Sequence, residues 1–310
     1  MNKSTSAFSS MTHISTPADA RPSSDRFRCG GRECNFLAAM LKTIVGMCLL
    51  VFAAAGGARA ADEPAETLTK LTVERARELA AIKGDLRLPK VASLSPEAAA
   101  ELAKLDGRLF LDGLTALPLD LARALVLFKG NMSLGGLTSL PEELAAVLGS
   151  RAKGNTHLNG LRTVAPASAS KFDSHGGMLY LDGVKSMSNE TAAAFESYRG
   201  ASLVLTNLSD ISDKGVISLA RHNKGNVLVL GITTLSPEAA AVLAQRKGKI
   251  KLRSLTSLSD EAAKNLVQTD AELTLTGLTE ISAEAAELMR SKKVDLPKKF
   301  RPAAASKGTN

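Results

Sequence analysis

The chain has 310 residues, which is enough for two ordinary domains or one elongated domain. It has no tryptophan and only 4% aromatic residues, so its 45% of hydrophobic residues favour a core of thin repeated layers. The formal charge of +8 points toward nucleic acid at first sight, but residues 61–289 hold 25 basic and 27 acidic side chains. The excess charge lies at the two ends, which argues against a nucleic-acid partner.

Residues 40–61, MLKTIVGMCLLVFAAAGGARAA, have the pattern of a secretory signal peptide. Lys42 supplies the positive charge, residues 43–55 form the apolar segment, and Ala58-Arg59-Ala60 matches a cleavage signal. We therefore predict a signal peptide at 40–60 and an exported chain, periplasmic or extracellular. If the signal is not cleaved, the same segment would anchor the protein to a membrane, which is the only membrane contact that we predict.

The segment before the signal peptide shows no periodicity. We predict that residues 1–39 are a disordered N-terminal extension, or that Met40 is the true start. All three cysteines, Cys29, Cys34 and Cys48, precede the predicted cleavage site. The mature chain would therefore need no disulfide, and we predict no metal site and no cofactor.

The remainder of the chain repeats itself every 23 or 24 residues. The stretch GLTSLPEELAAVLG at 136–149 returns as SLTSLSDEAAKNLV at 254–267. Four apolar columns keep this period through ten units: an anchor, and positions three before, five after and eight after it. The anchor residues are Leu71, Leu94, Leu117, Leu140, Val164, Met187, Ile211, Leu235, Leu258 and Ile281.

Each unit predicts a short strand followed by a helix. Apolar residues alternate before the anchor, as in Leu109-Phe110-Leu111, which indicates a strand with one face inward. After the anchor, Pro96 and Pro237 suit the first position of a helix. Hydroxyl residues that can cap a helix follow the anchor in seven units: Thr72, Ser95, Ser188, Ser212, Ser236, Ser259 and Ser282. Glycine ends most units, where we expect left-handed backbone: Gly84, Gly107, Gly130, Gly154, Gly200, Gly225 and Gly248.

This unit resembles the leucine-rich repeat, and most closely its cysteine-containing type, L-x-L-x-x-C-x-x-I-T-D-x-G-L-x-x-L-A. Residues 203–220, LVLTNLSDISDKGVISLA, follow that pattern with Leu208 at the cysteine position. The resemblance implies an α/β solenoid over 61–296, with a parallel sheet on one face and helices on the other. The basic tail, 297–310, is predicted to be disordered.

The outward row of the strands is the candidate binding surface. The alternation places an apolar patch of Tyr180, Val204, Leu228 and Leu230 on that face. Lys251 and Arg253 would flank it on one side, and His157 on the other. An apolar patch with a polar rim is typical of a binding site. The alternative is that strands simply favour such residues, or that a loop covers them, and placing Leu228 outward depends on the register.

The sequence offers little that is typical of a catalytic site. Ser174-His175 suggests a nucleophile and its base, but adjacent residues rarely align for this, so we treat the pair as part of a loop. The other two histidines after the signal, His157 and His222, lie in different units, and no phosphate-binding glycine loop is present. We therefore predict a monomeric, non-enzymatic protein that binds a protein or envelope polymer. The alternative is a structural or self-associating component of the cell envelope.

Overall fold

The computed structural model describes residues 64–222, 226–292 and 294–301. The predicted extension (1–39), the predicted signal peptide (40–60) and residues 302–310 of the predicted tail lie outside the described residues. A turn of 3₁₀-helix, η1 (Ala65–Thr67), opens the described part. From there the chain alternates strands and helices, as the repeat predicts.

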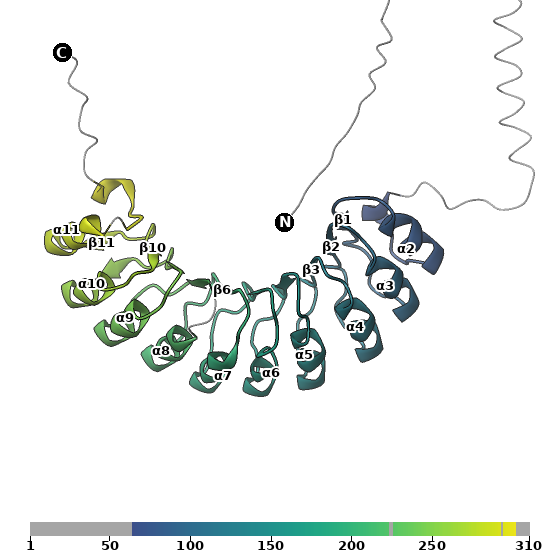
Figure 1. Cartoon of the computed structure of the whole chain (residues 1–310), viewed down its shortest axis with the longest axis horizontal. Helices are drawn as coiled ribbons and strands as arrows, with labels where there is room; N and C mark the ends of the chain where they lie inside the picture. Colours follow the sequence, from purple (N-terminus) through teal and green to yellow (C-terminus); the bar gives the residue numbers. More distant parts are fainter. Residues whose placement is uncertain (1–63, 223–225, 293, 302–310) are drawn as a thin grey trace, which may run out of the picture. The chain divides into compact units, whose positions relative to one another are not determined.

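The helices of successive repeats lie side by side along the outer, convex side of the solenoid (Figure 1). Their short length follows from the repeat, because each unit must fit a strand, a helix and two turns into 23 or 24 residues. Within the described residues, no helix is long and apolar enough to cross a membrane. The α-helices described are α2 (Val73–Ala80), α3 (Pro96–Leu102), α4 (Leu119–Val126), α5 (Glu142–Gly149), α6 (Pro166–Ser170), α7 (Asn189–Ala194), α8 (Asp213–Arg221), α9 (Pro237–Ala244), α10 (Asp260–Leu266) and α11 (Ala283–Ser291).

The main sheet has nine parallel strands in chain order and lines the inner, concave side (Figure 1). Its strands are β1 (Leu86–Arg87), β2 (Arg108–Phe110), β3 (Asn131–Ser133), β4 (Thr156–His157), β5 (Met178–Tyr180), β6 (Ser202–Leu205), β7 (Val227–Leu230), β8 (Lys249–Lys251) and β10 (Glu272–Thr274). Two further strands, β9 (Ser257–Leu258) and β11 (Glu280–Ile281), pair with each other before the last two helices. The predicted α/β solenoid with a parallel sheet is confirmed.

The core lies between the sheet and the helices and consists of the repeated columns. Every residue three before, five after and eight after the anchor is buried, including Ala99 and Leu102 on α3. The small alanine lets each helix backbone approach the strands, and the leucine eight after the anchor fills the layer beside it. Seven anchor residues are also buried, and Leu94, Ile211 and Ile281 pack against the core partly buried.

The helix starts are capped as predicted. All seven predicted hydroxyls accept a hydrogen bond from the backbone N–H three residues later, at about the same distance in each unit. Pro96 and Pro237 occupy the first turns of α3 and α9, where a proline removes no needed donor. The helices α4, α5 and α6 follow Pro118, Pro141 and Ala165 and have no side-chain cap. The unit at 156–177 contains the shortest of the described α-helices, α6, with five residues.

The glycines that end the units have two different roles. Gly84, Gly154 and Gly248 adopt the positive φ that the sequence predicted, at +110°, +79° and +92°. Gly107, Gly130 and Gly200 do not, so the prediction of left-handed backbone there is wrong, and Gly225 lies outside the described residues. A Cβ on Gly107 would instead lie 1.8 Å from the carbonyl oxygen of Gly84, because neighbouring units stack closely there.

The C-terminal end of the described chain continues beyond the last helix. Asp295 pairs with Thr274 of β10, and Leu296 is buried. The predicted tail begins with a turn of 3₁₀-helix, η3 (Lys298–Phe300), whose Phe300 packs against the core partly buried. The guanidinium of Arg301 donates to the carbonyl oxygen of Leu296 at 2.7 Å.

Candidate functional site

The sheet register decides which side chains face the concave surface. Across β5 to β8, Tyr180 pairs with Val204, Val204 with Val229, and Val229 with Lys251. Side chains alternate along a strand, so these paired residues form one row on the outward face. The inward row next to it runs through Leu203, Leu228 and Ile250, all fully buried.

The register therefore corrects the sequence prediction in β7. Leu228 and Leu230 are 0% and 1% exposed and belong to the core, so they cannot form part of a surface patch. Val229 takes the outward place, with Val227 two residues before it. Gly231 follows the strand at once, and its N–H donates to the carbonyl oxygen of Leu205 in the preceding unit at 3.0 Å. Compared with the preceding unit, the turn after the strand is one residue shorter, and the strand starts one residue later.

A depression of about 260 Å³ lies on the concave surface over β5 to β8. We call it the strand-face depression. Its apolar part comes from valines of β6 and β7, and its cationic part from Lys251 at the end of β8 and from Arg253 after it. The residues that line it are Met178, Tyr180, Ser202, Val204, Thr206, Val227, Val229, Lys251 and Arg253.

Four of the seven residues predicted for the site line this depression: Tyr180, Lys251, Arg253 and Val204, which is only 8% exposed. His157 lies beside it, with its ring stacked on that of Tyr180 at 3.9 Å between centroids and 9° between planes. Burial under this stack lowers the pKa of His157, although the nearby carboxylates of Asp182 and Asp112 oppose the effect. The imidazole is therefore a neutral, planar extension of the tyrosine surface near pH 7.

The Asp and Asn side chains on the other side of the depression bond to backbone N–H groups. The Asp182 carboxylate accepts from the N–H of Thr206 at 3.1 Å, and Asn159 accepts in the same way from the N–H of Asp182. Two units before Asn159, Asp112 accepts from the N–H of Gly135 at 2.7 Å. These side chains link the turn of one unit to the next, which explains their place in the sequence without a ligand.

The structure also assembles a buried column that the sequence interpretation missed. It lies eleven residues after each anchor, at the ends of the helices, and carries polar side chains in the middle of the solenoid. The same alignment of units would have shown it, because the column keeps the 23- or 24-residue period. We call it the helix-end column, and its buried members are Leu105, Phe128, Arg151, His175, Tyr198, His222, Arg246 and Thr269.

Backbone carbonyls satisfy only part of this column, since the buried Nε atoms of Arg151 and Arg246 have no hydrogen-bond partner among the described residues. Arg151 donates to the carbonyl oxygens of Phe128 and Gly130 at 3.1 and 2.8 Å, and Arg246 donates to that of Ala220 at 3.1 Å. The Tyr198 hydroxyl donates to the carbonyl oxygen of Gly177 at 2.7 Å. Among the described residues, neither arginine forms an ion pair with a carboxylate.

Burial controls the protonation of the column. It lowers the pKa of His175 to about 4, with a further contribution from the Arg151 charge. It lowers the pKa of His222 to about 4 as well, where Arg246 adds to the effect. The Nε2 atom of His175 lies 2.9 Å from the Thr156 hydroxyl, deep in the core. His175 is therefore no catalytic base for the exposed Ser174, in agreement with its interpretation as a loop residue.

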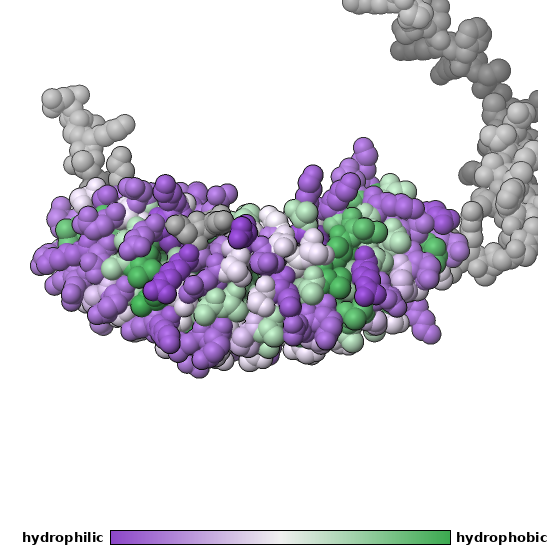
Figure 2. Space-filling view, turned by 60° about the horizontal axis from the view of Figure 1, so that its bottom comes forward, coloured by the Kyte–Doolittle hydropathy of each residue, from purple (hydrophilic) through white to green (hydrophobic). Residues whose placement is uncertain are grey.

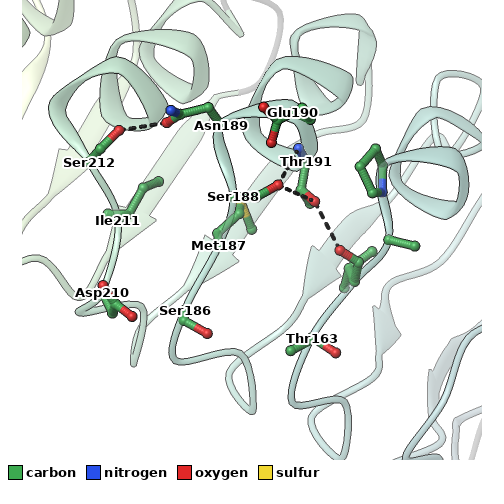
Figure 3. A pocket seen from close by; sticks show the side chains of 13 residues that line it. Thr163, Ser186, Met187, Ser188, Asn189, Glu190, Thr191, Asp210, Ile211 and Ser212 are labelled. Atoms are coloured by element: carbon green, nitrogen blue, oxygen red, sulfur yellow. Dashed lines mark hydrogen bonds between the residues drawn. The ribbon is translucent and has the colours of Figure 1, made fainter.

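A second hollow, of about 700 Å³, lies at the starts of α6, α7 and α8 (Figure 3). Three of its hydroxyls hold the helix starts. Ser188 caps α7, Thr191 donates to the carbonyl oxygen of Val164 at 3.0 Å, and Ser212 donates to Asn189 at 2.5 Å. No histidine lines the hollow, so Ser188 has no imidazole base there to activate it. These contacts are structural.

The face drawn in Figure 2 is mostly hydrophilic, with separate hydrophobic areas, one of them over α4. Leu127, directly after α4, is 66% exposed and borders a third hollow of about 690 Å³ together with Leu105 and Lys129. Among the described residues, no group of three or more His, Cys, Asp or Glu side chains is placed to hold a metal ion.

No protein-family model matches the chain, and no curated protein matches it. Solved structures with a similar fold include an internalin from Listeria monocytogenes, with 14% identity over 73% of this chain and 64% of that one (TM-score 0.47). Others are a leucine-rich repeat protein of Leptospira interrogans (20% identity, 71% and 61% covered, TM-score 0.39) and TLR13 in complex with ssRNA13 (14%, 74% and 39%, TM-score 0.46). The chain spans less than two-thirds of the length of each.

The repeated strand–turn–helix units, the parallel sheet and the buried columns together define a leucine-rich-repeat solenoid of the α/β class. A fold of this kind presents a continuous strand face but brings no chemistry of its own. What it can do is therefore decided by the side chains on its surface, of which the strand-face depression is the candidate binding group.

Proposed function

We propose that this chain is an exported, non-enzymatic leucine-rich-repeat protein that binds a protein or envelope polymer through its strand face. The observation that carries the proposal is the strand-face depression. Its floor of valines adjoins the stacked rings of His157 and Tyr180, and its rim carries Lys251 and Arg253. An apolar centre with a polar, charged rim is the arrangement that protein interfaces use.

Export and repeat type are parts of the same proposal. The signal-peptide pattern at 40–60 supports a periplasmic or extracellular location, or a membrane-anchored one if the signal stays. Within the repeat family, we propose the cysteine-containing type with an apolar residue at the cysteine position. Leu208 supports this, because it fills that position fully buried.

Crosslinking in the native cell envelope, followed by capture of the tagged protein, tests the binding function. We expect the wild-type chain to capture a partner, and Tyr180→Ala combined with Val229→Asp to lose it. Leu127→Asp is the matched control, because it adds the same carboxylate to an exposed apolar residue far along the chain from the depression. A partner that the double variant retains and the control variant loses would contradict a strand-face site.

The apolar area over α4 favours a second candidate, self-association as an envelope component (Figure 2). Leu127 and the hollow beside it would then form the contact. Sedimentation velocity over a hundredfold range of concentration separates the two functions. A monomer at every concentration supports the binding function, whereas an oligomer that Leu127→Asp dissociates supports self-association.

A further inference from the structure

Two cations of the strand-face depression, Lys251 and Arg253, have no side-chain partner among the described residues. Neither forms an ion pair or a side-chain hydrogen bond there. Other cations on the strand side are engaged: Lys249 pairs with Glu272 at 2.7 Å, and Arg87 lies over the Phe110 ring at 4.0 Å. The positive charge at this edge of the depression is therefore free for a ligand.

The nearby acids do not neutralise that charge. The carboxylate of Asp182 is directed to the N–H of Thr206, and that of Asp112 to Ser133 and Gly135. Both belong to the turns on the side of the depression away from Lys251. A ligand that reaches Lys251 and Arg253 therefore meets two positive charges and no competing carboxylate among the lining residues.

The floor beside the cations is apolar. Val204 and Val229 pair across β6 and β7, and Val229 pairs with Lys251 of β8. Adjacent strands are about 4.8 Å apart, and successive residues of an extended peptide advance about 3.4 Å. A peptide crossing these strands can thus place an aliphatic side chain over Val229 and a carboxylate at Lys251 one or two residues further on.

We propose that the strand-face depression binds an acidic peptide segment of another protein, in which an aliphatic residue stands next to aspartate or glutamate. The aliphatic side chain covers Val204 and Val229, and the carboxylates pair with Lys251 and Arg253. This proposal rests on the proposed function, that the strand face binds a partner, and adds the chemistry of that partner.

A phage library of random twelve-residue peptides tests the proposal on residues 61–310 and on three variants. The first variant, Lys251→Ala with Arg253→Ala, removes the two positive charges. The second, Val229→Asp, puts a carboxylate into the apolar floor of the depression. The control variant, Arg162→Ala with Lys185→Ala, removes two exposed cations from turns outside the depression. Circular dichroism first establishes that all four proteins are folded.

We expect the wild type and the control to select peptides that combine acidic and aliphatic residues. The fluorescence anisotropy of a selected, labelled peptide should show affinity about tenfold weaker for each cation removed, and weaker binding at higher salt. Replacing the glutamates of that peptide by glutamine, or its aliphatic residues by serine, should weaken its binding to the wild-type protein by a similar factor.

Three outcomes would overturn the proposal. If the selected peptides are neutral or basic and Val229→Asp abolishes their binding, the strand face binds a partner, but the proposal that this partner is an acidic peptide is refuted. Binding of acidic peptides that ignores their aliphatic residues, and that a sulfated polysaccharide displaces equally well, would indicate a general polyanion surface. Failure to select any peptide that depends on the depression would refute both the acidic class and a protein-binding strand face.

Discussion

Leu228 and Val229 are neighbours in β7 with opposite surroundings, and a matched pair of substitutions tests their placement. Leu228 is fully buried, so Leu228→Asp puts a carboxylate into the core without a partner. We expect it to lower the free energy of unfolding by more than about 4 kcal/mol. Val229→Asp should cost less than about 1 kcal/mol, because its side chain faces the concave surface. Urea denaturation measures both, and equal costs would contradict the register.

Gly84 and Gly107 test the two reasons for glycine at the end of a unit. Gly84 has φ +110° and open space around a Cβ, so Gly84→Ala should cost about 1 kcal/mol through backbone strain. Gly107→Ala would place a Cβ 1.8 Å from the Gly84 carbonyl oxygen and force two units apart. We therefore expect it to cost at least twice as much in chemical denaturation, and a smaller cost than for Gly84→Ala would refute the close stacking.

At the scale of the element, helix α6 is short and uncapped, and a cap can be supplied. The backbone of Ala165, at φ −73° and ψ 149°, is close to that of Ser236, which caps α9 at φ −73° and ψ 157°. The hydroxyl of Ala165→Ser should accept from the N–H of Ser168 and stabilise the protein by about 0.5–1 kcal/mol. Ser236→Ala, the reverse change, should cost about 1 kcal/mol. Thermal unfolding of both variants checks the pair, and a destabilising Ala165→Ser would show that the cap geometry at α6 differs.

At the scale of the whole molecule, the helix-end column predicts acid sensitivity. His175 and His222 have a folded-state pKa of about 4, against 6.5 for an ordinary histidine. Between these values the unfolded chain binds more protons than the folded chain. The contribution of the histidines to stability is therefore complete above pH 6.5 and is lost as the pH falls toward 4. The loss is on the order of 3 kcal/mol for each histidine.

Urea denaturation at pH 7.0, 5.5 and 4.5 measures this loss. His175→Gln combined with His222→Gln is the comparison, since glutamine keeps a polar side chain of similar size that does not titrate in this range. We expect the double variant to lose much less stability on acidification than the wild type. His157 and the surface carboxylates are common to both proteins, so an equal loss in the two would show that the column is not responsible.

The repeat and its elements could be predicted from the sequence because their causes are local. A 23- or 24-residue period in four apolar columns dictates one layer per unit, and a hydroxyl such as Ser95 caps the helix that begins beside it. Tyr180 and Lys251 line the strand-face depression, because alternation within β5 and β8 is unambiguous.

The tertiary structure alone decided the rest. The run Val227–Leu230 is apolar at every position, so it is compatible with either alternation, and only the pairing with β6 in the neighbouring unit decides which residues face inward. His175 and His222 lie 47 positions apart in the sequence. Stacking of the units brings them to either side of Tyr198 and buries them, and this burial, which no local pattern encodes, sets their pKa.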